Sequence, residues 1–198
     1  MTTMGRFARW SINRRTLGRA HRELAVVGPH LGLGTASRVL ELGSGGGGLL
    51  ALLEERYRPA ALVGTDFDPS QVDAARTFLT ARWGSLPAGI ELRSADALAL
   101  PFADASFDWV FAMEMLHHVE ARHSEYVQRP RALEEVRRVL RPGGSLVYSE
   151  FSRRSEVRHT LEGLGFAAQF LRTGWRRDVA VYRSPTNIGP GPTRTGAP

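Results

Sequence analysis

The stretch of the sequence best suited to chemistry is a run of glycines at residues 43–48. It follows an apolar, strand-like segment, residues 38–42, and precedes residues 49–55, which have helical character. A strand, a glycine turn and a helix in this order form sites where backbone N–H groups and a helix N-terminus receive an anionic group. We therefore predict a loop that binds a nucleoside cofactor, and a plain flexible loop is the alternative. The glycines at every second position are Gly43, Gly45 and Gly47.

Acidic residues follow two further strand-like segments. Residues 61–66 are mostly apolar and end in Asp66, and Asp96 comes shortly after residues 90–94. A carboxylate only accepts hydrogen bonds, so Asp66 could accept from both hydroxyl groups of a ribose. The alternative role of Asp66 is that of an ordinary turn or cap residue, although Asp68 is the better candidate for capping a helix.

A glutamate and two histidines follow a fourth strand-like segment, residues 107–112. Neutral histidine suits a general base near neutral pH, so Glu114, His117 and His118 are candidates for taking a proton from a reacting group. The alternative for each of these three residues is a structural role without proton transfer. His123 together with the two histidines suggests a metal site, but adjacent residues on a helix point apart. We therefore expect no metal.

The segments that must position these residues alternate between strands and helices. This alternation predicts an α/β fold with a doubly wound, mostly parallel, Rossmann-like sheet. Ligands of such sheets lie beyond the carboxyl ends of the strands, so the site residues should converge there. The last two strands are close enough in sequence to form an antiparallel edge hairpin. The seven predicted strands are residues 38–42, 61–66, 90–94, 107–112, 145–149, 166–171 and 178–183. The predicted helices are residues 16–27, 46–57, 70–82, 131–140 and 155–164.

The length of 198 residues is that of one domain with a substantial core. Residues 1–34 form a basic helical segment, which is either a lid over the site or a helix packed on the body. Residues 35–184 form the domain itself. Residues 185–198, rich in proline and glycine, are expected to be disordered because they have almost nothing to bury.

The composition excludes several classes of protein. The chain has no cysteine, so disulfides and thiolate chemistry are ruled out. No apolar run approaches the roughly 20 residues that a membrane span needs, and we expect a cytoplasmic protein. The net charge of +6 is concentrated at the termini, because residues 1–23 hold six arginines and one acid, and residues 153–198 eight arginines and three acids. Binding of nucleic acid through these termini is one interpretation, and arginines on solvated helix faces are the alternative.

Four stretches resemble, in the same order, the motifs of class I S-adenosylmethionine-dependent methyltransferases, in particular the small UbiE-like (methyltransferase type 11-like) branch. Each motif alone is weakly specific, but four in register indicate this family over about residues 35–183. The four stretches are ELGSGGG at 41–47, GTDFDPSQ at 64–71, ADALALPF at 95–102 with SFD at 106–108, and EEVRRVLRPGG at 134–144.

The resemblance implies S-adenosylmethionine as the cofactor and assigns parts of it to residues. Glu41 would face the methionine amine or orient the loop. Asp66 would bind the ribose, and Phe67 would pack on the adenine, although Phe67 could equally belong to the core. Asp96 would accept from the adenine amino group, and Ala97 would offer its N–H to a ring nitrogen. The resemblance also implies cofactor contacts for Gly43, Ser44, Gly45, Gly47 and Met113.

The sequence departs from the family pattern after Glu150, where the next helix begins almost directly and many relatives insert a substrate cap. A lid must then come from residues 1–30 or 121–130, and the acceptor site should be small and fairly open. We expect a small-molecule acceptor; its identity, the acceptor atom, the base and the oligomeric state are not written in the motifs. The competing interpretations are an NAD-dependent oxidoreductase, because Gly43, Gly45 and Gly48 also match G-x-G-x-x-G, a non-catalytic binding module, and an RNA methyltransferase that uses the basic termini.

Overall fold

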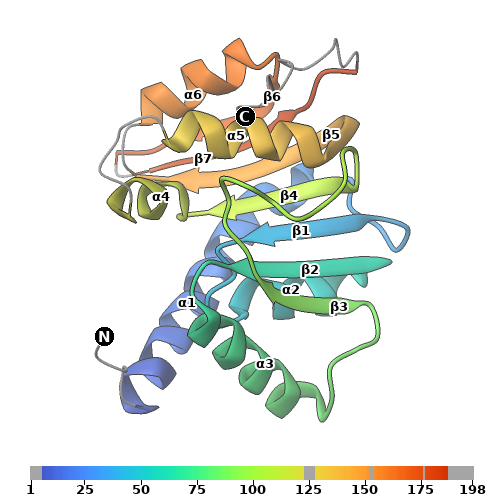
Figure 1. Ribbon diagram of the computed structural model, residues 1–198, viewed down its shortest axis with the longest axis vertical. Helices are drawn as coiled ribbons and strands as arrows, with labels where there is room; N and C mark the ends of the chain where they lie inside the picture. The colour runs from blue at the N-terminus through green and yellow to red at the C-terminus, as the bar shows by residue number, and fades with distance from the viewer. Residues whose placement is uncertain (1–5, 123–127, 152–153, 176, 187–198) are drawn as a thin grey trace, which may run out of the picture.

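The structure is a computed structural model that describes residues 6–122, 128–151, 154–175 and 177–186, and in these residues one seven-stranded sheet is covered by helices (Figure 1). The order of strands across the sheet is β3-β2-β1-β4-β5-β7-β6. The strands are β1 Arg38–Leu42, β2 Ala61–Asp66, β3 Ile90–Ser94, β4 Phe107–Met113, β5 Leu140–Glu150, β6 Ala167–Thr173 and β7 Asp178–Arg183.

Strands β1 to β5 pair in parallel, and β7 lies antiparallel to both β5 and β6. The chain moves outward from β1 to β2 and β3 and then returns, so that β4 lies on the other side of β1. The order of the sheet therefore reverses between β1 and β4, which is where ligands bind in open α/β sheets. The predicted mostly parallel sheet with an antiparallel hairpin at its edge is confirmed.

Helices cover both faces of the sheet, which makes it doubly wound. Side chains of α1, α2 and α3 share one buried cluster with one side of the strands, and side chains of α4, α5 and α6 share the other. Along β1, Val39 belongs to the first cluster and Leu40 to the second, because successive side chains of a strand point to opposite faces. The helices are α1 Arg6–Val27, α2 Gly48–Tyr57, α3 Pro69–Trp83, α4 Leu116–Arg122, α5 Gln128–Val139 and α6 Arg154–Gly163, with a short 3₁₀ turn at Gly28–His30.

The largest differences from the sequence-based expectation are the early starts of α1 and β5 and one helix that was not predicted. Helix α1 begins at Arg6, ten residues earlier than predicted, because arginine is a good helix former and extends the helix without an apolar stripe. Strand β5 begins at Leu140, directly after α5, since Leu140 pairs with Phe107 before a shift in register. Gly144 lies in this irregular stretch, where a Cβ would come within 3.0 Å of the Asp108 carbonyl oxygen. Helix α4 was absent from the predicted helices.

Parts of the predicted organisation lie outside the described residues. These parts are residues 1–5 of the basic segment, residues 123–127 of the second candidate lid, and residues 187–198 of the tail. The second half of α1 packs on the body, because Ala20, Leu24 and Val27 are buried in the first core cluster. None of the helices in the described ranges is long and apolar enough to cross a membrane.

Candidate active site

A cavity of about 340 Å³ lies at the carboxyl ends of β1, β2 and β4. Seven of the residues predicted to bind a cofactor and two of the candidate bases line it, although they are spread over 76 positions of the sequence. The lining residues that the sequence predicted are Gly43, Gly45, Asp66, Phe67, Asp96, Ala97, Met113, Glu114 and His118. Four predicted site residues do not line the cavity: Glu41, Ser44, Gly47 and His117.

The glycine loop after β1 depends on backbone conformations that favour glycine. Gly43, Gly45 and Gly47 all have positive φ angles, of 67°, 50° and 80°. A Cβ on Gly43 would come within 2.7 Å of the Met115 side chain, whereas a Cβ on Gly45 would meet nothing within 4 Å. Since Gly45 lines the cavity, a ligand can approach its bare backbone closely. Gly47 is the N-cap of α2, so the amide-rich start of that helix lies just behind the loop.

Asp66 is fixed by the backbone on both sides of its carboxylate. One oxygen accepts a hydrogen bond from the Gly45 N–H at 3.0 Å, and the other accepts from the Asp68 N–H at 3.0 Å. Each oxygen retains capacity for a second hydrogen bond. Asp68 itself caps α3 by accepting from the Ser70 N–H at 2.9 Å, as expected from its position before Pro69.

The side chain of Phe67 is 47% exposed and lines the cavity, so it does not belong to the core. On the neighbouring loop, Asp96 accepts from the Leu98 N–H at 2.9 Å and Ala97 is buried. The cavity therefore has an exposed aromatic ring from one strand end and a carboxylate with an adjacent backbone N–H from the next. These are suitable groups for a flat heterocycle that carries an amino group.

Helix α5 holds the Asp96 loop in position through two charged side chains. Glu135 accepts from the Leu100 N–H at 2.7 Å. Arg138 donates to the Leu100 and Phe102 carbonyl oxygens at 2.9 and 2.7 Å and pairs with Glu135 at 2.8 Å. This role was not predicted from the sequence. Their spacing of three residues, which places both side chains on one side of a helix, was the available signal.

Glu41 lies beneath the glycine loop and is buried, and its Oε2 atom has no hydrogen-bond partner. Burial, and then the negative charge of Asp66, raise the pKa of the Glu41 carboxyl well above its usual range. The Ser44 hydroxyl is a second buried polar atom without a partner in the same loop. Unpaired buried polar groups are costly, and these two sit beside the cavity that Gly45 opens into.

The histidine pair after β4 divides between two environments. His118 lines the cavity. The ring of His117 turns toward β5, where its Nδ1 atom lies 3.2 Å from the fully buried Glu150 carboxylate. The two imidazole centroids are 4.0 Å apart, and the ring of Phe151 packs 4.5 Å from His117. In the described residues no group of three or more His, Asp or Glu side chains is arranged to hold a metal ion, and His123 lies outside them.

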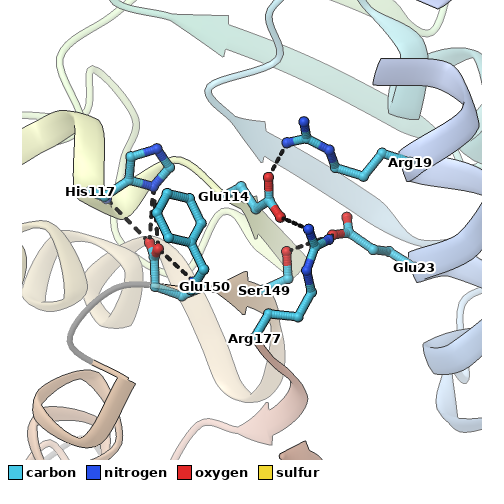
Figure 2. Close-up of polar contacts among 8 residues, drawn as sticks. Arg19, Glu23, Glu114, His117, Ser149, Glu150 and Arg177 are labelled. Atoms are coloured by element: carbon cyan, nitrogen blue, oxygen red, sulfur yellow. Dashed lines mark hydrogen bonds and ion pairs between the residues drawn. The ribbon is translucent and has the colours of Figure 1, made fainter. Parts of the chain in front are cut away.

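Two arginines that were not predicted as site residues form a charged cluster with Glu114 (Figure 2). Arg19 of α1 lines the cavity and pairs with Glu114 at the end of β4. Arg177, from the turn before β7, pairs with the same carboxylate at 2.7 Å. No local sequence pattern indicates the pairing of Arg177 with Glu114, because the two residues are 63 positions apart. Arg19 lies in residues 16–27, which were predicted to form a helix with one buried side.

Comparisons with known proteins agree with this geometry. A family model described as a methyltransferase domain matches residues 40–148, which is more than half of the chain. The chain is 40% identical over 116 residues to a demethylmenaquinone methyltransferase of Thermus thermophilus, covering 58% of this chain and 47% of that protein. It is 37% identical over 123 residues to a phthiotriol/phenolphthiotriol dimycocerosates methyltransferase of Mycobacterium leprae, covering 62% and 41%.

Among solved structures, a SAM-dependent methyltransferase from Aquifex aeolicus superposes with a TM-score of 0.68 and 20% identity over 87% of this chain and 96% of that chain. The fold is therefore shared with this class. The chain belongs to the methyltransferase domain family, and within that family it resembles the UbiE-like enzymes. It spans about half the length of the curated relatives that it matches.

The cofactor of this class is S-adenosylmethionine, and the residues around the cavity fit it. The open space at the bare Gly45 backbone would be filled by a Cβ, which explains why glycine is required beside a ligand. The orphaned polar atoms belong to Glu41, two residues before the loop, and to Ser44 of the loop itself. The carboxylates of Asp66 and Asp96 can accept from hydroxyl and amino groups of a nucleoside, and the ring of Phe67 offers a face to its base.

Proposed function

We propose that this protein is an S-adenosylmethionine-dependent methyltransferase that acts on a small-molecule acceptor by in-line displacement. The observation that carries the proposal is that Asp66, Asp96 and the glycine loop border one cavity at the switch point of the sheet. The carboxylates and the loop come from three different strand ends, so their convergence is a property of the fold and not of local sequence. The family match supports methyl transfer over the oxidoreductase alternative.

In this proposal Asp66 accepts from the ribose hydroxyls, and Phe67 covers one face of the adenine. Asp96 accepts from the adenine amino group, while the Ala97 N–H serves a ring nitrogen. Gly43, Gly45 and Met113 border the methionine end, and Gly47 starts the helix that faces it. Glu41 and Ser44 act from beneath the loop, where their unpaired atoms can bind either the amine or the loop backbone.

S-adenosylmethionine supplies, when bound, a methyl group already activated on a sulfonium. The protein therefore has mainly to align the acceptor, and good alignment lowers a barrier by roughly 7–11 kcal/mol. A base is needed only for an acceptor that must lose a proton. We infer that His118 is this base, because it lines the cavity. His117, held by Glu150, packs beside it, and Glu114, held by two arginines, is the weaker candidate.

Isothermal titration with S-adenosylhomocysteine and with NAD tests this function. We expect S-adenosylhomocysteine to bind with a micromolar dissociation constant and NAD not to bind. Binding of NAD without binding of S-adenosylhomocysteine would favour a nicotinamide oxidoreductase instead. Absence of both would leave only a non-catalytic module with the same fold.

A further inference from the structure

Four charged side chains from distant parts of the chain meet in one cluster (Figure 2). Two of them, Arg19 and Glu114, line the cavity. Arg19 and Glu23 come from α1, Glu114 follows β4, and Arg177 precedes β7. Arg19 pairs with one oxygen of the Glu114 carboxylate, and Arg177 pairs with the other oxygen at 2.7 Å. Arg177 also pairs with Glu23, which accepts a hydrogen bond from the Ser149 hydroxyl at 3.0 Å.

The two glutamates of this cluster have different surroundings. Glu23 connects α1 to β5 and to Arg177 and does not line the cavity, so it fastens the helix to the body. Burial and the negative charge of Glu114 raise the pKa of the Glu23 carboxyl. Glu114 lines the cavity, and its backbone has a φ of 50°, which is uncommon for a residue with a side chain. Such strained positions concentrate at binding and catalytic sites.

The two arginine side chains are more exposed than the glutamate side chain that both of them pair with. The side chains of Arg19 and Arg177 are 43% and 38% exposed, whereas that of Glu114 is 7% exposed. Planar guanidinium groups suit carboxylates because they offer paired donors. The residues that line the cavity together with Arg19 include the apolar Met115 and Val119. The cavity lining therefore combines a cationic group with apolar side chains.

We propose that Arg19, supported by Arg177, binds a carboxylate of the methyl acceptor, which takes the place that the Glu114 carboxylate occupies in the free protein. In the free protein the Glu114 carboxylate pairs with the guanidinium of Arg19, so it competes with the carboxylate of the acceptor. The acceptor is an acid with an apolar body. This inference rests on the proposed function, because it takes the cavity to be the site of methyl transfer.

If Glu114 competes with the acceptor for Arg19, removing its charge should strengthen binding of a carboxylate. If the cluster only holds α1 on the body, removing that charge should not strengthen binding. The probes are octanoate and octan-1-ol, titrated into the full chain saturated with S-adenosylhomocysteine. We expect wild type to bind octanoate more tightly than octan-1-ol. Glu114→Gln should bind octanoate about tenfold more tightly than wild type, because the competing charge is removed. Arg19→Gln should bind it about tenfold more weakly, and Arg19→Lys should recover part of the loss.

Matched controls are available at the far end of the sheet and on β3. Arg141 is a surface arginine, 46% exposed and paired with Asp108, and Glu91 is an exposed acid. Arg141→Gln and Glu91→Gln change the net charge as the test variants do, and we expect octanoate affinity to stay within about twofold of wild type. Thermal melting of every variant identifies any that fails to fold.

Several outcomes would overturn the inference. Weaker octanoate binding by both Glu114→Gln and Arg19→Gln would mean that the cluster only fastens α1. Equal binding of octanoate and octan-1-ol by wild type would mean that the site does not recognise a carboxylate. If Arg19→Gln weakened S-adenosylhomocysteine but not methylthioadenosine, which lacks the amino-acid part, Arg19 would hold the cofactor's carboxylate instead. Failure of wild type to bind S-adenosylhomocysteine at all would count against the proposed function itself.

Discussion

Asp66 combines two duties in one carboxylate. Its oxygens accept from the backbone of Gly45 and of Asp68, so the side chain is rigid before any ligand arrives. A carboxylate fixed in this way loses little freedom on binding and can offer its remaining lone pairs to a ligand. The same two hydrogen bonds connect the glycine loop to the end of β2, so the side chain also joins two parts of the site.

Replacing Asp66 by asparagine should weaken binding of S-adenosylhomocysteine. The amide keeps the size of the side chain but has one acceptor oxygen and no charge, so we expect the dissociation constant to rise about 10- to 100-fold, or ~1.4–2.8 kcal/mol. Asp73→Asn on the exposed side of α3 is the control. Titration calorimetry on both variants measures the difference, and equal affinities would exclude Asp66 from the nucleoside site.

Gly45→Ala tests the close approach of a ligand to the loop. Alanine at a φ of 50° is strained by roughly 1–2 kcal/mol, and its Cβ points into open space at the cavity. Gly84 also has a positive φ and nothing within 4 Å of a Cβ, but it caps the C-terminus of α3. We expect Gly45→Ala and Gly84→Ala to lower the free energy of unfolding similarly. Only Gly45→Ala should weaken binding of S-adenosylhomocysteine, and a similar loss in both would contradict the close approach.

Burial of Glu41 predicts a pH dependence of stability. The pKa of Glu41 is raised above its usual 4.5, so the folded state holds this proton more tightly than the unfolded chain. The resulting stability is complete below pH 4.5 and is lost as the pH rises through the folded-state pKa. Glu41→Gln carries no such proton, so its stability relative to wild type should increase between pH 4.5 and pH 8. Urea unfolding at the two pH values measures this, and a constant difference would contradict the assignment.

At the scale of the elements, α5 supports the cofactor side of the cavity from the outside. Its Glu135 and Arg138 hold the backbone of the loop that carries Asp96. The helix also buries Ala132, Leu133 and Val136 fully against the sheet, so its position is fixed by packing. A loop that would otherwise be free to move is thereby held at the edge of the cavity.

Arg138→Gln should therefore affect both stability and binding. The substitution removes hydrogen bonds to two carbonyl oxygens and the ion pair with Glu135, so we expect a loss of about 1–3 kcal/mol in the free energy of unfolding. Arg141→Gln breaks an exposed pair and should cost about 0–1 kcal/mol. Urea unfolding compares them. Weaker binding of S-adenosylhomocysteine by Arg138→Gln alone would support the positioning role, and equal stability of the two variants would contradict it.

At the scale of the whole molecule, the centre of the sheet was predictable because β1, β2 and β4 are short apolar runs that lead into Gly43, Asp66 and Glu114. The helix after β4 and the early start of β5 were missed, since neither has a clear periodic signal of its own. The convergence of Gly45, Asp66 and Asp96 followed from the rule that ligands bind at strand carboxyl ends. The meeting of Arg19, Glu114 and Arg177 did not, because it depends on how α1 and the last hairpin pack.

The uneven charge of the chain has a structural explanation in part. Where the structure describes the two basic terminal segments, four of their arginines make ion pairs with acids of the body or of the last strand. Arg19 and Arg177 meet at Glu114, and Arg154 and Arg158 hold the buried Asp178. These arginines serve the internal structure, so the positive charge of the termini is a weaker argument for nucleic acid than the composition alone suggested.

A crystal structure of the complex with S-adenosylhomocysteine would show where the nucleoside binds. We expect the ribose at Asp66, the adenine between Phe67 and the Asp96 loop, and the sulfur directed toward Arg19, Glu114 and His118, which line the cavity. A nucleoside bound elsewhere on the molecule, or bound in this cavity with its ribose away from Asp66, would contradict this expectation.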